Sequence, residues 1–308
     1  MLNTKSVEDL QRTNHFSCLI YGEPGVGKTT FALTATKPLL LDCDNEGSSR
    51  VKLDVLANAD CATISSFQEL EAITEEDIAP YETIIIDTFG TLVEYAALSI
   101  TQGAPSPKEW GLIRTKVLNF LHKIEHKNRI TIAHVKAVEQ GTSKDKITKL
   151  EPLAQGSAID AFITQCTIMG FMSRNASGQT IINFSGGETT QGKNTFDFPP
   201  MVIAPNDYKA FQRLEQKIKA YREQELQQQE KFKNIWLPLR AKIDQATTPE
   251  HFTMIRNEFL QEEDILHLHD KARRLLNERN NLPQFRYEFD SITQSFKKPS
   301  SNEGGENE

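Results

Sequence analysis

Short apolar runs alternate with longer polar stretches through the first two thirds of the chain. The runs are rich in β-branched and other apolar residues, which is typical of strands buried in a sheet. The clearest of them lie at residues 16–21, 39–41, 83–87 and 129–134. Between them, apolar residues recur every three or four positions, the spacing of helices that bury one face, at 67–73, 92–100 and 110–124. This alternation predicts an α/β fold with a mainly parallel sheet between helices.

The pattern changes from about residue 206 onward. Gln, Glu and Lys dominate, glycine becomes rare, and acidic and basic residues balance. Helices are expected at 211–232, 236–243, 249–259 and 265–277. We therefore divide the chain into an α/β domain (1–205), a helical C-terminal module (206–290) and a polar, disordered tail (291–308).

Composition limits the classes of protein that fit this sequence. The net charge of -7 excludes a wholly basic nucleic-acid binder but allows a local basic patch. The four cysteines are scattered without CxxC spacing, which favours free thiols in a reducing cytosol. No apolar run approaches the ~20 residues of a membrane-spanning helix. We expect a cytoplasmic protein without a membrane partner.

A glycine-rich turn follows the first predicted strand and carries the strongest chemical signal. Its residues form the G-x-x-x-x-G-K-T pattern of a phosphate-binding P-loop: Gly22, Glu23, Pro24, Gly25, Val26, Gly27, Lys28, Thr29 and Thr30. Glycines let successive backbone N–H groups curl around an anion. Lys28 is expected to reach the β- and γ-phosphates of ATP, and the Thr29 hydroxyl to ligate Mg²⁺.

Polar residues follow three further predicted strands, where ligands bind in open α/β sheets. Asp44 and Glu46 come after the strand at 39–41, and either could act on the phosphates or belong to a solvated turn. Asp87 ends a β-branched run, the Walker B pattern of an acid that holds Mg²⁺. His134 ends the strand at 129–134 and could contact the γ-phosphate or its attacking water, or be a structural histidine.

Two segments beyond these strands have distinct patterns. Residues 136–158 form a long polar stretch with several lysines, and a loop of this length in a compact domain is typically functional or disordered. Strand-like runs at 164–172 and 180–184, joined by the turn at 173–178, predict a hairpin.

These motifs together resemble the RecA superfamily of P-loop ATPases, and within it the phage RecA-like single-strand-annealing ATPases. The matching segments lie at residues 19–30, 39–47, 83–92, 130–136 and 192–194. The resemblance covers about residues 15–205 and implies a RecA-like core, ATP hydrolysis with Mg²⁺, and action on single-stranded DNA in recombination. It also implies assembly into a ring or filament, with a single-strand-binding protein as a further partner.

The resemblance assigns roles to individual residues. The catalytic glutamate of the family falls on Asp44, which is one methylene shorter, with Glu46 as the substitute. The family's K-N-R pattern becomes Lys193-Asn194-Thr195, without the arginine, and Lys193 would reach the γ-phosphate of a neighbouring subunit. Residues 136–158 fall where the family carries a mobile DNA-contacting loop, although this segment lacks an aromatic residue for base stacking.

Two other functions compete with this one. The first is a regulatory or assembly ATPase that works through its helical C-terminus on protein partners, without DNA. The second is a nucleotide or small-molecule kinase, which would need a mobile lid with several arginines. Residues 136–158 contain no arginine, which disfavours the kinase.

Overall fold

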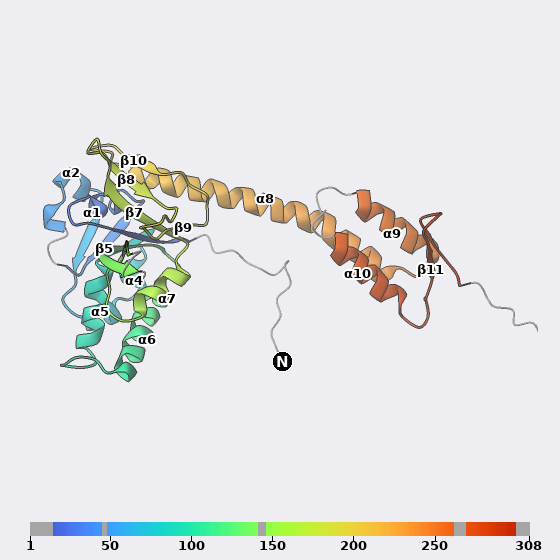
Figure 1. Ribbon diagram of the computed structural model, residues 1–308, viewed down its shortest axis with the longest axis horizontal. Helices are drawn as coiled ribbons and strands as arrows, with labels where there is room; N and C mark the ends of the chain where they lie inside the picture. The colour runs from blue at the N-terminus through green and yellow to red at the C-terminus, as the bar shows by residue number, and fades with distance from the viewer. Residues whose placement is uncertain (1–14, 45–47, 141–145, 262–268, 300–308) are drawn as a thin grey trace, which may run out of the picture. The chain divides into compact units, whose positions relative to one another are not determined.

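The computed structural model describes residues 15–44, 48–140, 146–261 and 269–299 of the chain (Figure 1). The described residues up to Tyr221 form one compact unit, and those from Arg222 onward form a second. This division falls inside a helix, whereas the sequence places the domain boundary at 205. The first unit holds every described site residue predicted above.

A twisted sheet forms the centre of the first unit. Its strands follow the order β10-β8-β7-β1-β5-β4-β2-β3, and β6 and β9 pair with β5 and β7. The six strands from β3 to β7 in this order run parallel, while the β7–β8 and β8–β10 pairs are antiparallel. Their bounds are β1 (Ser17–Gly22), β2 (Pro38–Asp42), β3 (Asp60–Thr63), β4 (Thr83–Asp87), β5 (Asn128–Gln140), β6 (Ile147–Pro152), β7 (Ile168–Arg174), β8 (Thr180–Asn183), β9 (Lys193–Asn194) and β10 (Met201–Ile203).

Helices cover both faces of this sheet (Figure 1). One face packs on α3 (Phe67–Ala72), α4 (Glu75–Ile78), α5 (Phe89–Leu98), α6 (Pro107–Lys123) and α7 (Ala158–Gln165). The other face packs on α1 (Lys28–Ala32), α2 (Leu53–Leu56) and the start of α8 (Ala210–Gln245). The predicted α/β fold with a mainly parallel sheet is therefore confirmed.

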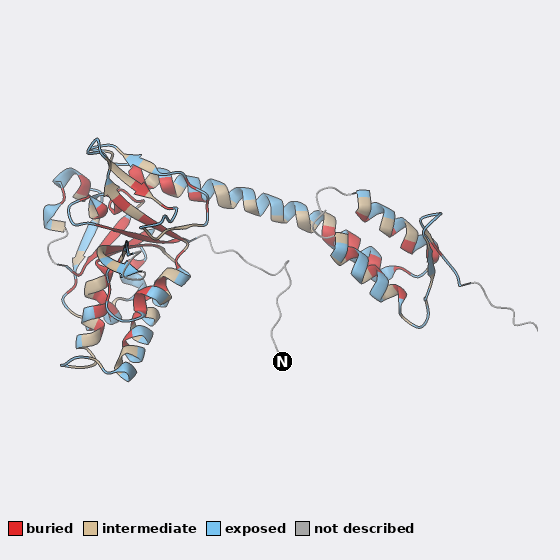
Figure 2. Ribbon diagram, viewed as in Figure 1, coloured by how far each residue is buried: buried red, intermediate tan, exposed pale blue. Residues whose placement is uncertain are grey.

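Alternation along the central strands explains this layered arrangement. In β4, Ile84 and Ile86 enter the core beneath α5 and α6, while Ile85 enters the core beneath α1 and α8. Successive side chains of a strand point to opposite faces, so an uninterrupted apolar run buries both faces at once. Figure 2 shows the buried residues concentrated in these strands.

The first turns of α8 belong to the core of the first unit rather than to a separate module. Phe211 is fully buried and packs its ring against Phe16 and Phe31. The Glu215 carboxylate accepts hydrogen bonds from the backbone N–H and hydroxyl of Thr36 and from the Thr83 hydroxyl. These contacts hold the beginning of α8 against the segment that follows α1 and against the start of β4.

The second unit has its own small core. The rest of α8 packs with α9 (Pro249–Gln261), α10 (His269–Asn280) and a hairpin of β11 (Glu288–Asp290) and β12 (Ser295–Lys297). Trp236, Phe252 and Phe259 are fully buried in this core. A helical C-terminal region is therefore present, as the sequence predicts.

Three expectations from the sequence differ from the structure. The helices expected at 211–232 and 236–243 form one continuous helix, α8. Residues 295–297 form strand β12, with Phe296 buried against the second core, so the predicted disorder does not begin at 291. Much of the polar segment 136–158 is a β-hairpin, formed by the end of β5 and β6, rather than an irregular loop. Residues 141–145 and 300–308 lie outside the described part of the chain.

Candidate nucleotide-binding site

Four polar or glycine positions meet at the carboxyl edge of the parallel strands. The register pairs Gly22 of β1 with His134 of β5, and Asp42 of β2 with Asp87 of β4. Strand β5 lies between the P-loop strand β1 and the acidic strand β4. The sheet thus brings residues that are far apart in sequence to one edge, where open α/β sheets bind their ligands.

The P-loop needs glycine at two positions for different reasons. A Cβ on Gly22 would lie 2.1 Å from the carbonyl oxygen of Met172, because β7 passes close to this residue. Gly27 has a φ of 98°, in the left-handed region that residues with a Cβ rarely adopt. The motif glycines therefore allow both the close approach of β7 and the sharp entry into α1.

Lys28 is held in place by the loop that it follows. Its Nζ donates hydrogen bonds to the carbonyl oxygens of Gly22, at 2.9 Å, and Glu23, at 2.8 Å. The side chain is buried, and burial lowers the pKa of the ammonium group against the opposing effect of Asp87. An ammonium group has three donors, so one remains for a bound anion.

A hydroxyl and a carboxylate meet beside this lysine. The Thr29 Oγ1 donates to Oδ2 of Asp87 at 2.6 Å, which joins the P-loop helix to the end of β4. Asp87 is 3% exposed, and burial is the main cause that raises the pKa of its carboxyl group to about 6. Hard oxygen donors of this kind suit Mg²⁺, which usually takes one or two protein ligands and completes its shell with phosphates and water.

A full protein cage for a metal is not seen in the described part of the chain. No group of three or more His, Cys, Asp or Glu side chains is arranged to hold a metal ion there. The pair of Thr29 and Asp87 therefore fits a magnesium ion that arrives with a phosphate ligand, and does not fit a permanent protein-bound metal.

Asp44 is held beside Asp87 by backbone hydrogen bonds between the ends of β2 and β4. The N–H groups of Cys43 and Asp44 both donate to the carbonyl oxygen of Asp87, at 2.7 and 3.2 Å. The hydroxyl of Tyr95 donates to the carbonyl oxygen of Cys43 at 3.0 Å. These bonds hold the segment that carries Asp44 against the end of β4.

His134 completes the group from β5. Burial, and after it the charge of Lys28, lowers the pKa of the imidazole, so His134 is neutral at pH 7. Its Nδ1 is buried and has no hydrogen-bond partner within the described ranges. A neutral imidazole with an unused ring nitrogen can exchange hydrogen bonds with a ligand or a water molecule.

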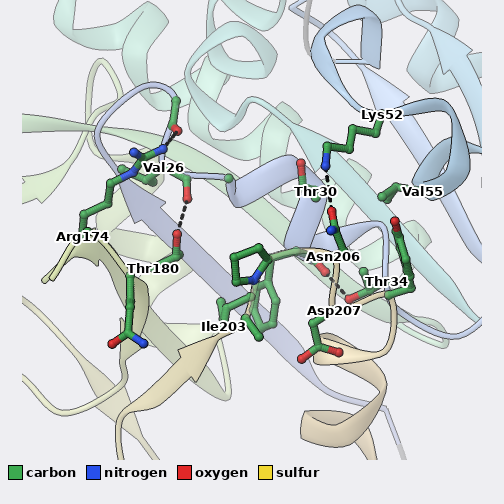
Figure 3. A pocket seen from close by; sticks show the side chains of 18 of the residues that line it. Val26, Thr30, Thr34, Lys52, Val55, Arg174, Thr180, Ile203, Asn206 and Asp207 are labelled. Carbon is green, nitrogen blue, oxygen red and sulfur yellow. Dashed lines mark hydrogen bonds between the residues drawn. The ribbon is translucent and has the colours of Figure 1, made fainter.

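Two adjoining cavities surround the P-loop. The smaller, of about 190 Å³, is lined by P-loop residues together with Asp44, Arg50, Val51, Asp87 and His134. The larger, of about 760 Å³, lies between the P-loop, α2, the β7–β8 hairpin and the connection from β10 to α8 (Figure 3). We call them the phosphate cavity and the outer cavity.

Hydrogen bonds connect the walls of the outer cavity (Figure 3). Lys52 donates to the side-chain oxygen of Asn206 at 2.7 Å. The Arg174 guanidinium donates to the carbonyl oxygen of Gly25, and the Thr180 hydroxyl to that of Val26. The β7–β8 hairpin, which the sequence predicts correctly, therefore supports the outer side of the P-loop.

The structure brings most of the predicted site residues together. Lys28, Thr29, Asp44, Asp87 and His134 all line the phosphate cavity. Glu46 lies outside the described residues. Lys193 is elsewhere, where its Nζ donates to the carbonyl oxygens of Ile163 and Thr164 in the last turn of α7.

Two lining residues carry no signal in the sequence analysis. Arg50 and Val51 line the phosphate cavity from the short 3-10 turn η2 (Ser48–Arg50) and its end. No motif marks them. The chain reaches the cavity at these residues through the turn that Ser48 makes with Asp42, which no strand-end position signals.

The strand order, the P-loop and the acid that ends β4 define the α/β core of a P-loop nucleotide-binding protein. A model of the AAA domain family matches residues 14–196, more than half of the chain. The chain therefore belongs to the AAA domain family and is an ATPase.

Comparisons with other proteins give more distant similarities. The ATPase domain of another solved protein is similar with a TM-score of 0.38 and 11% identity, over 62% of this chain and 81% of that one. The RadB recombinase is similar with a TM-score of 0.33 and 14% identity, over 54% of this chain and 79% of that one. No curated protein sequence matches the chain. Among the described residues, no helix has the length and apolar character needed to cross a bilayer.

Proposed function

We propose that the chain binds ATP with Mg²⁺ and couples its hydrolysis to the binding of single-stranded DNA. The triphosphate occupies the phosphate cavity, with Lys28 on one side and the Thr29–Asp87 pair on the other. The nucleoside extends into the outer cavity, which adjoins the first along Gly25, Gly27 and Thr30. A magnesium ion held by Thr29 and Asp87 neutralises phosphate charge.

Asp44 and His134 are the residues that act on the attacking water in this proposal. Both line the phosphate cavity, and the bonds from Cys43 and Asp44 to Asp87 fix the position of the acid. Asp44 orients the water, and neutral His134 contacts the water or the γ-phosphate through a hydrogen bond. Glu46 is the alternative acid.

One observation carries the coupling to DNA: strand β5 continues from the phosphate cavity into the β5–β6 hairpin. His134 lies on this strand, and its carbonyl oxygen accepts a hydrogen bond of 2.7 Å from the N–H of Leu153, where the hairpin returns. A displacement of His134 on phosphate binding or release would therefore act directly on the hairpin. The hairpin is the proposed contact with DNA.

The lysines of the hairpin give this contact its charge. Lys136 and Lys149 lie on the same face of the hairpin, since their cross-strand partners are Glu151 and Val138. Lys146 is paired with Glu139 at 2.6 Å. Contacts of this kind bind phosphates without reading sequence, and they weaken as salt rises.

Assembly is the remaining part of the proposal. The family resemblance supports a ring or filament in which Lys193 of one copy reaches the γ-phosphate bound by its neighbour, with a single-strand-binding protein as a further partner. Lys193 now caps the end of α7, so it would exchange those carbonyl contacts for the neighbour's phosphate. In this proposal the assembled protein anneals or exchanges single strands of DNA, as a phage recombinase does.

The test is the steady-state ATPase rate with and without a single-stranded oligonucleotide. We expect stimulation that declines as salt rises, and loss of stimulation in the double variant Lys136→Gln/Lys149→Gln. The control is Lys108→Gln/Lys219→Gln, which removes the same charge from two exposed lysines outside the hairpin and should leave stimulation intact.

The same assay separates the proposal from its main rival. An ATPase that turns over ATP without DNA stimulation and without salt-dependent DNA binding would be a regulatory or assembly ATPase. The contacts of α8 with the P-loop helix favour a role for the C-terminal unit in that case, because α8 continues into it.

A further inference from the structure

One side chain outside the P-loop lines both cavities. Gly25, Gly27, Thr30 and Arg50 are the residues that the phosphate cavity and the outer cavity share. The first three belong to the P-loop motif, and Arg50 comes from η2 after β2. Arg50 therefore lies at the passage through which a bound nucleotide would run from its phosphates to its nucleoside.

The charges around the phosphate cavity indicate that Arg50 matters for binding an anion there. Among the described residues, the ionisable ones that line it are Lys28, Asp44, Arg50, Asp87 and His134, and the histidine is neutral at pH 7. The two acids oppose the two cations, so these described side chains have no net charge together with Arg50 and a net negative charge without it. A negatively charged cavity would repel a magnesium triphosphate, which itself keeps negative charge.

The backbone that carries Arg50 is anchored on both sides. Before it, the N–H and hydroxyl of Ser48 donate to Oδ2 of Asp42 at 3.0 and 2.6 Å, and Asp42 is 1% exposed. After it, Val51 is buried in the core beneath α1, and its N–H donates to the carbonyl oxygen of Ser48. Anchors of this kind reduce the entropy lost when a long side chain binds a ligand.

We propose that Arg50 is a phosphate-binding residue that contacts the polyphosphate of the nucleotide at the passage between the two cavities. A guanidinium presents a planar fork of donors that matches phosphate oxygens, unlike the point charge of Lys28. In this role Asp42 is a positioning residue, since it holds the turn from which Arg50 extends. The inference rests on the proposed ATP site and adds a second cation to it.

Magnesium tripolyphosphate tests this inference because it has the phosphates of ATP and no nucleoside. Its affinity is measured by calorimetry on the full chain, for wild type, Arg50→Gln, Arg50→Lys and Lys52→Gln. We expect Arg50→Gln to weaken tripolyphosphate at least tenfold and Arg50→Lys to recover part of that loss. Lys52 lines only the outer cavity, so Lys52→Gln, which removes the same charge two residues later, should bind tripolyphosphate within twofold of wild type.

The outcomes separate this inference from the proposed function. Equal weakening by Arg50→Gln and Lys52→Gln would show a general charge effect, and wild-type affinity in Arg50→Gln would show no contact; either result overturns the role of Arg50. Failure of the wild-type chain to bind both tripolyphosphate and ATP would instead overturn the proposed site. Melting curves of each ligand-free variant establish that a lost affinity does not reflect unfolding.

Discussion

The hydroxyl of Thr29 donates a hydrogen bond of 2.6 Å to the carboxylate of Asp87. The two residues are 58 positions apart in the chain, and the sheet order places them at the same edge. Asp87 is also buried, so this single bond compensates only part of the cost of removing its charge from water. The stability of the ligand-free protein should therefore depend on the ionisation of Asp87.

Asp87→Asn should stabilise the ligand-free protein at pH 7.5. The folded-state pKa of Asp87 is raised to about 6, so the folded state binds more protons than the unfolded state between about pH 4 and 6. Wild-type stability thus falls as pH rises through this window, by at most about 3 kcal/mol. Thermal melts of both proteins across pH 4 to 8 measure it. A stability difference that is the same at every pH would contradict this cause.

Lys28→Ala should weaken nucleotide binding roughly 10- to 100-fold, the loss of a charged hydrogen bond to phosphate. Titration with a fluorescent ATP analogue measures the affinity. Lys108→Ala is the control, because Lys108 is an exposed lysine on α6 and does not line the phosphate cavity. If Lys28→Ala bound the analogue with wild-type affinity, Lys28 would not contact the nucleotide and the proposed site would be wrong.

Asp44→Asn should spare nucleotide binding and reduce turnover at least tenfold, because the amide keeps the shape of the side chain and loses the charge that orients water. Steady-state assays at saturating ATP measure turnover, and equilibrium titration measures binding. Glu46→Gln is the paired variant. If Glu46→Gln stops turnover and Asp44→Asn does not, the catalytic acid is Glu46.

Lys193→Met should keep ATP binding and lose turnover if Lys193 acts on the nucleotide of a neighbouring copy. Mixing it with Lys28→Ala should then restore turnover, since the second variant supplies an intact Lys193 to sites with an intact Lys28. The alternative outcome is wild-type turnover with a stability loss of about 0.5 to 1 kcal/mol. That result would limit Lys193 to capping α7.

Glu215→Ala should destabilise the first unit by about 2 to 3 kcal/mol. It leaves the N–H and hydroxyl of Thr36 and the hydroxyl of Thr83 without their acceptor. Glu215→Gln retains an acceptor oxygen and should lose less than half as much. Denaturant unfolding of the full chain measures both, and equal losses would indicate that the negative charge, rather than the hydrogen bonds, is needed.

The parts of the site that follow strand ends could be predicted from the sequence. Asp44, Asp87 and His134 each lie at or just after the end of an apolar run, and Lys28 follows the glycine-rich turn after the first run. Parallel strands bring such positions together whatever their separation in the chain. Arg50 could not be found this way. It depends on the path of the chain after β2, which Asp42 and Ser48 determine through a side-chain contact that has no periodic signature.

The sequence does not predict the β5–β6 hairpin, for a different reason. Most of its residues beyond Val135 are exposed or half-buried on both faces, so polar and apolar residues do not alternate clearly. Its position depends instead on distant contacts, such as the hydrogen bond from the Tyr21 hydroxyl to the carbonyl oxygen of Leu150. Similarly, the strand that contains Phe296 follows from packing on α9, which local composition does not reveal.

The packing of α8 determines where the ATPase can be cut from the rest of the chain. A fragment that stops at residue 205 would expose the rings of Phe16 and Phe31 and leave Thr36 without its acceptor. Such a fragment should be recovered as insoluble material, whereas one that continues through Tyr221 should purify as a soluble enzyme. Limited proteolysis of the full chain should accordingly cut α8 beyond Tyr221 and release a stable catalytic piece.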